Sequence, residues 1–175
     1  DVVITPGYVQ EGGPPLWIAT MSEAGAERVA RHDAHILPQG LRARAFDPWV
    51  EALHESGRSP DHYRKGIIRS VLVTDDLDRD WRPVRTAERY RMQLYRRFFE
   101  ESNEGFGEDG EPIPQTWIVG DVSDCVDQLE AFVRAFGITD LVTMAVPPGL
   151  PVDALNHSHE QLFKVVVPQL KARLN

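Results

Sequence analysis

The sequence predicts an α/β fold with parallel strands, and two patterns indicate it. Short apolar runs alternate along the chain with segments whose apolar residues recur at helical spacing. Runs that are apolar throughout, rather than alternating with polar residues, are typical of parallel strands with both faces covered. The 175 residues contain four such runs. A small open sheet and about half of an eight-stranded barrel both fit this pattern.

The predicted strands are short apolar runs bounded by polar residues, glycine or proline. The clearest of them is 67–74, which is rich in β-branched residues. The segment 116–120 ("TWIVG") is expected to be only a short extended piece. The four strands are expected at 16–20, 34–37, 67–74 and 141–146.

The predicted helices follow from capping residues and from apolar side chains at helical spacing. Ser22 and Ser123 are expected to be N-caps, and Asp47 is followed by a proline suited to the first helical position. Pro168 is expected to kink the last helix. The helices are expected after Ser22, from Asp47 to Gly57, over 78–101, from Ser123 to Gly137 and over 156–173.

The chain reads as a single domain over 1–175, with a flexible polar loop at 102–116. Its first residue is Asp1, not methionine, and a Pro- and Gly-rich stretch follows soon after. We therefore expect the sequence to be a fragment of a longer protein.

Composition excludes several classes of partner. The net charge of −8 argues against nucleic acid or an anionic membrane, because phosphate groups are bound by basic surfaces. A single cysteine allows no intrachain disulfide and no cysteine-based zinc site, which fits a cytoplasmic location. No stretch approaches the roughly 18 apolar residues of a membrane-spanning helix.

Ligands of parallel α/β folds bind where the carboxyl ends of the strands meet. The candidate positions are Thr20-Met21-Ser22, Pro38-Gln39-Gly40, Thr74-Asp75-Asp76 and Val146-Pro147-Pro148.

The first two positions suggest specific contacts. A helix is expected to begin directly after Thr20, so its unbonded N–H groups and positive dipole end would suit a phosphate. The simpler interpretation is that Ser22 only caps that helix. Gln39 could donate to a heteroaromatic ring, or it could be an ordinary surface residue of a loop.

Several other features favour structural roles. The segment 105–110 ("GFGEDG") matches a dinucleotide-binding pattern, but it follows a charged helix and leads into prolines, so no nucleotide site is predicted. His157 and His159 do not share a helix face, so no metal site is predicted. The arginines of 79–97 fit a solvated helix face or a face toward a partner chain, and Cys125 is interpreted as a buried residue of the core. Arg69 points either into a barrel, where it would need a functional partner, or outward under a helix.

Three segments carry recognisable motifs in a fixed order: 14–40 ("PPLWIATMSEAGAERVARHDAHILPQG"), 117–146 ("WIVGDVSDCVDQLEAFVRAFGITDLVTMAV") and 163–171 ("FKVVVPQLK"). Together they resemble the carboxyl-terminal half of the bacterial luciferase-like flavin-dependent monooxygenases. In the first segment the matching residues are Pro14, Pro15, Trp17, Ser22, Gly25, Arg31 and Gly40.

The resemblance implies a (β/α)8 TIM barrel, of which this chain would supply roughly the carboxyl-terminal four βα units. It implies FMN as cofactor, with F420 as the alternative. The phosphate would be held after the fifth barrel strand and the ring would pass the end of the next strand. The cofactor-binding residues would then be Thr20, Met21, Ser22, Gly25, Gln39 and Gly40.

The implied function is a monooxygenase in which reduced FMN and oxygen oxidise a small organic substrate. The alternatives are an F420-dependent hydride-transfer oxidoreductase on the same barrel and a non-catalytic half-barrel or dimerisation module. The resemblance also implies a homodimer and a flavin reductase as partner. The sulfonate-oxidising branch carries a tryptophan where Gln39 stands and a strand arginine from which Arg69 is displaced by one position. Arg69 is therefore only a weak candidate for a catalytic residue.

Overall fold

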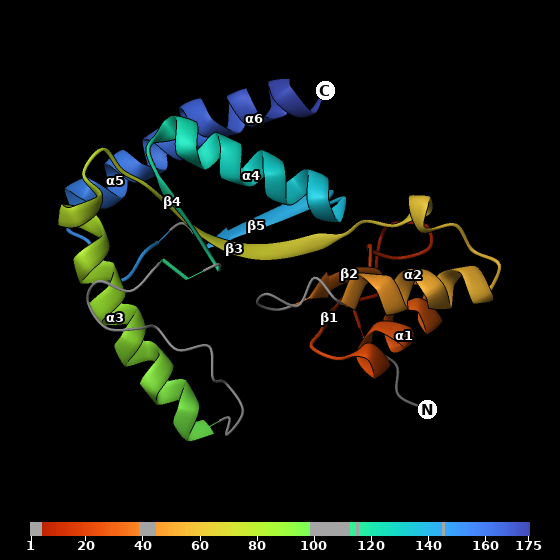
Figure 1. Ribbon diagram of the computed structural model, residues 1–175. Coiled ribbons are helices and arrows are strands. Elements are labelled where there is room, and N and C mark those ends of the chain that lie inside the picture. The colour runs from red at the N-terminus through yellow and green to blue at the C-terminus, as the bar shows by residue number, and fades with distance from the viewer. Residues whose placement is uncertain (1–4, 39–44, 99–112, 115, 145) are drawn as a thin grey trace. The chain divides into compact units, whose positions relative to one another are not determined.

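The computed structural model describes residues 5–38, 45–98, 113–114, 116–144 and 146–175. The chain divides into two compact units, residues 1–67 and 68–175, with the boundary inside a strand. The predicted loop at 102–116 lies almost wholly outside the described residues, as do Gln39 and Gly40. Figure 1 shows the elements of both units.

The first unit is a strand–helix–strand–helix sequence. Its two strands pair in parallel, with Trp17 opposite His35 and Thr20 opposite Pro38. The elements are β1 (Trp17–Thr20), α1 (Glu23–Arg31), β2 (His35–Pro38), α2 (Phe46–Glu55) and a 3-10 turn (Pro60–His62).

Helix α1 begins as predicted. Ser22 has an extended backbone at the N-cap position, and its Oγ accepts a hydrogen bond from the N–H of Gly25 at 3.1 Å. The helix packs against α2 and buries Ala26, Val29 and Ala30. This local cap, together with the buried apolar stripe, explains why the helix follows β1 with so short a turn.

The start of α2 differs from the prediction. The helix begins at Phe46 with Ala45 as N-cap and no capping side chain, so Asp47 lies within the first turn. A carboxylate there still interacts favourably with the helix dipole, and burial of Trp49 and Leu53 holds the helix in place.

The second unit contains a three-stranded sheet in the order β4-β3-β5. Strands β3 and β4 are parallel, with Ser70 opposite Trp117 and Val73 opposite Gly120. The elements are β3 (Gly66–Val73), α3 (Leu77–Phe98), β4 (Trp117–Gly120), α4 (Val122–Phe136), β5 (Asp140–Met144), α5 (Val152–Gln161), a π turn (Leu162–Val166) and α6 (Val167–Leu174).

The count of four strands was wrong, because the described residues form five. The segment predicted to be a short extended piece is β4, and its residues Trp117, Ile118 and Val119 are buried. Four residues are too few to show a strand pattern by themselves. Pairing with β3, which lies more than 40 residues earlier in the chain, makes this segment a strand.

Helices cover both faces of this sheet. Val71 and Val73 pack with residues of α4 and the terminal helices, whereas Leu72 packs with Trp81 of α3 and Trp117. The strand order explains why helices lie on both faces, because the chain moves from β3 to β4 and then back across β3 to β5 (Figure 1). Right-handed crossovers in opposite directions lie on opposite faces. The α/β class with parallel strands is confirmed, but the consecutive strand order of a barrel is absent from these three strands.

The N-cap of α4 was also assigned wrongly. It is Asp121, whose carboxylate accepts the N–H of Asp124 at 2.9 Å, and not Ser123. Both residue types are good caps, so residue type alone could not distinguish them. Gly137 ends α4 as predicted, with the left-handed φ of 61° that glycine adopts without strain.

The last helix starts at Val152, four residues before the predicted start, and continues to Leu174 through the π turn. In that turn the N–H of Val167 donates to the carbonyl of Leu162, five residues back. The irregularity expected at Pro168 therefore takes the form of a wide turn that ends just before the proline, which has no N–H to donate. None of the described helices is long and apolar enough to cross a membrane.

Candidate functional site: the carboxyl ends of the strands

The turn between β1 and α1 is held by three hydrogen bonds. Thr20 is buried, and its Oγ1 donates to the carbonyl of Ser22 at 3.2 Å and accepts the N–H of Ser22 at 3.4 Å. The Oγ of Ser22 accepts from Gly25, which completes the cap. The direction in which the first N–H groups of α1 point is therefore set by two hydroxyl side chains.

Two backbone donors remain at this helix start. The N–H groups of Gly25 and Ala26 both donate to Ser22, whereas those of Glu23 and Ala24 donate to no other described residue. Unbonded N–H groups at the positive end of a helix suit an anion such as a phosphate. A negative charge that disfavours anion binding is also present, because the exposed Glu23 side chain lies in the first turn of the helix.

Gly25 permits a close approach of helix and strand. A β-carbon at this position would lie 1.9 Å from Oγ1 of Thr20, well inside any real contact. No other residue type fits here without displacing the turn that carries the two donors. This is a packing reason for glycine at a position that the sequence motif had already singled out.

The end of β2 lies beside this turn, because Thr20 and Pro38 are partners across the two strands. The predicted ring-contacting residues Gln39 and Gly40 lie outside the described residues, so their role stays a prediction.

In the second unit, a buried carboxylate of α3, Asp80, lies at the end of β3 and was not predicted from the sequence. Thr74 donates to Asp80 at 2.6 Å, and Arg79 donates to both oxygens of Asp80 at 2.7 Å. The Arg79 hydrogen bonds are the main cause that lowers the pKa of Asp80, and Thr74 adds to this effect although burial opposes it. Thr74 also accepts the N–H of Asp76 at 3.0 Å, so this cluster shapes the strand end.

Helix α5 is tied to the same strand end. The buried Ser158 accepts the N–H of Val73 at 3.0 Å, and Nε2 of His157 lies 3.3 Å from Asp75. The "HSH" segment thus contributes its serine to the fold. Among the described residues, no group of three His, Cys, Asp or Glu side chains could hold a metal ion. The apolar spacing of the last helix, in which position 158 falls on the buried side, was the signal available in the sequence.

Arg69 lies under a helix, the second of the two predicted alternatives. Its side chain is buried, its guanidinium stacks 4.1 Å from the centre of the Phe132 ring of α4, and it donates to the carbonyl of Ile68 at 2.8 Å. It stands within β3 and not at the carboxyl end of the strand. Cys125 is also buried in the core, as expected, and burial raises the pKa of its thiol to about 12.

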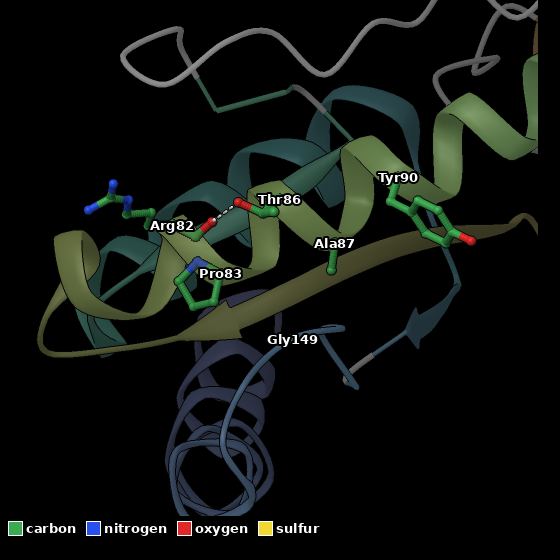
Figure 2. Close-up of a pocket in the computed structure, with 6 residues that line it drawn as sticks. All are labelled: Arg82, Pro83, Thr86, Ala87, Tyr90 and Gly149. Carbon is green, nitrogen blue, oxygen red and sulfur yellow. Dashed lines mark hydrogen bonds between the residues drawn. The ribbon is translucent and has the colours of Figure 1, made fainter.

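The last candidate position, Val146-Pro147-Pro148, leads into a loop that packs on α3. Gly149 has a φ of 85°, and a β-carbon there would lie 2.7 Å from the carbonyl oxygen of Pro83. A surface groove of about 580 Å³ follows this contact and is mostly apolar (Figure 2). Its lining residues are Arg82, Pro83, Thr86, Ala87, Tyr90 and Gly149.

Parallel strands followed by helices define an α/β protein. The sequence matches the family model of the luciferase-like monooxygenases over residues 1–140, so the chain belongs to this family. Among proteins of curated function, no sequence matches.

Solved structures show the same fold. Monooxygenase RslO1 from Streptomyces bottropensis is 13% identical, with a TM-score of 0.70 over 94% of this chain and 51% of its own. The oxygenating constituent of 3,6-diketocamphane monooxygenase from Pseudomonas putida, in complex with FMN, is 19% identical, with a TM-score of 0.66 over 89% of this chain and 49% of its own. The F420-dependent tetrahydromethanopterin reductase from Methanopyrus kandleri is 16% identical, with a TM-score of 0.60 over 89% and 51%. The chain thus spans about half the length of the structures that it resembles.

Proposed function

We propose that the chain is the carboxyl-terminal half of a flavin-dependent luciferase-like monooxygenase, and that α1 binds the phosphate of FMN. The observation that carries the proposal is the pair of N–H groups of Glu23 and Ala24, which donate to no described residue at the end of β1. Membership of the luciferase-like monooxygenase family supports a flavin phosphate as the ligand of this helix start. One of the structurally similar monooxygenases was solved with FMN.

The residues present fit an FMN phosphate. Two backbone N–H groups and the positive helix end would hold the anion, and the exposed Ser22 lies at the same turn. The Thr20 hydroxyl fixes the turn before any ligand binds, so less order has to be created on binding. Gly25 lets the turn lie close to β1. Reduced FMN supplies the electrons that activate oxygen toward a small organic substrate.

Gln39 and Gly40 are proposed to contact the flavin ring. Support comes from strand pairing, since Pro38, the last residue of β2, lies beside Thr20 at the end of β1. A glutamine amide has both donors and an acceptor for the polar edge of a heteroaromatic ring. In this arrangement α1 binds the phosphate and the segment after β2 orients the ring.

Hydride transfer with F420 is the second candidate. The specific observation in its favour is the F420-dependent tetrahydromethanopterin reductase, whose TM-score of 0.60 lies close to the 0.66 of the FMN complex. Both cofactors are flavin-like and phosphorylated, so the phosphate position alone does not distinguish them.

Titration of the complete protein with FMN and with F420, followed by flavin fluorescence, tests the proposal. We expect saturable binding of FMN and much weaker binding of F420. Binding of F420 without FMN would move the function to the second candidate. Binding of neither would support a non-catalytic barrel.

We also propose that the complete protein forms a closed barrel. If its strands follow one another in chain order, β5 lies beside β4 in that barrel, whereas the order of the described strands is β4-β3-β5. A crystal structure of the complete protein would show which neighbour β5 has when all strands are present.

A further inference from the structure

We draw no further inference here: the strongest candidate, the mostly apolar groove along α3 that Arg82, Thr86, Tyr90 and Gly149 line, carries none, because nothing in the structure shows what covers it in the complete protein.

Discussion

Gly25 of α1 and Thr20 of β1 approach so closely that a β-carbon on Gly25 would lie 1.9 Å from Oγ1 of Thr20. That same hydroxyl makes two hydrogen bonds with the backbone of Ser22. Any side chain at position 25 must therefore move the turn whose N–H groups we propose bind a phosphate. Stability and binding are linked at this contact.

Gly25→Ala is expected to lower the free energy of unfolding by about 1–3 kcal/mol, as overpacking does. Alanine stabilises a helix relative to glycine by about 1 kcal/mol, so any loss of stability in Gly25→Ala shows that the steric clash outweighs the gain in helix propensity. Urea unfolding followed by circular dichroism measures this change in the free energy of unfolding. Gly7→Ala is the matched control, since a β-carbon at Gly7 meets nothing within 4 Å. The clash is not the cause if Gly25→Ala costs as much in a Thr20→Ala background, which lacks the hydroxyl.

Glu23→Gln is expected to strengthen FMN binding about two- to fivefold at low salt, because it removes a negative charge from the first turn of α1. The gain should shrink as the salt concentration rises, since the side chain is exposed. Titration at two ionic strengths checks this. Glu27→Gln, an exposed change of the same kind later in α1, should have little effect. Equal effects of the two changes would show that net charge, not position, is responsible.

Asp80→Asn is expected to lower the free energy of unfolding at pH 7 by about 1–3 kcal/mol, because hydrogen bonds to a buried carboxylate are lost. The hydrogen bonds from Arg79 and Thr74 lower the pKa of Asp80 below its ordinary value of 3.8, so its stabilising contribution is present above that pH and is lost as the pH falls through the folded-state pKa. The difference between the wild type and the variant should therefore shrink below pH 3.8.

Urea unfolding of the Asp80→Asn protein at pH 7 and pH 3 checks this dependence. Asp78→Asn, at an exposed position in the same first turn of α3, is the control. A difference between wild type and Asp80→Asn that stayed constant with pH would rule out the carboxylate as its source.

Arg69→Met is expected to leave FMN binding and turnover unchanged and to reduce stability by about 1–2 kcal/mol, since the guanidinium packs on Phe132 and bonds to a backbone carbonyl. Oxygen consumption with reduced FMN and substrate, measured beside thermal unfolding, separates the two effects. A folded Arg69→Met protein that binds FMN but does not turn over would return Arg69 to a catalytic role.

Local patterns in the sequence predicted several contacts that form within one segment. Ser22 caps α1 because a serine before a helical stripe needs only its own segment to form the cap, and the stripe of Ala26, Val29 and Ala30 is buried as expected. The end of α4 at Gly137 is local in the same way. These are contacts within a few residues, which residue type and spacing predict.

Features that depend on distant contacts were not predictable. Strand β4 is a strand only because it pairs with β3, and the order β4-β3-β5 depends on two crossovers. At the candidate site, the N–H of Val73 donates to Ser158, which lies 85 residues later in the chain. The apolar spacing of the last helix indicates that position 158 is buried, but a single sequence does not indicate which distant residue it contacts.

The phosphate position of FMN is tested most directly by comparing FMN with riboflavin, which lacks the phosphate. Fluorescence titration of the complete protein is expected to give at least about tenfold tighter binding of FMN. Gly25→Ala should reduce the affinity for FMN and leave that for riboflavin nearly unchanged. Equal affinities for the two flavins in the wild type, or an equal loss for both in Gly25→Ala, would contradict a phosphate site at the start of α1.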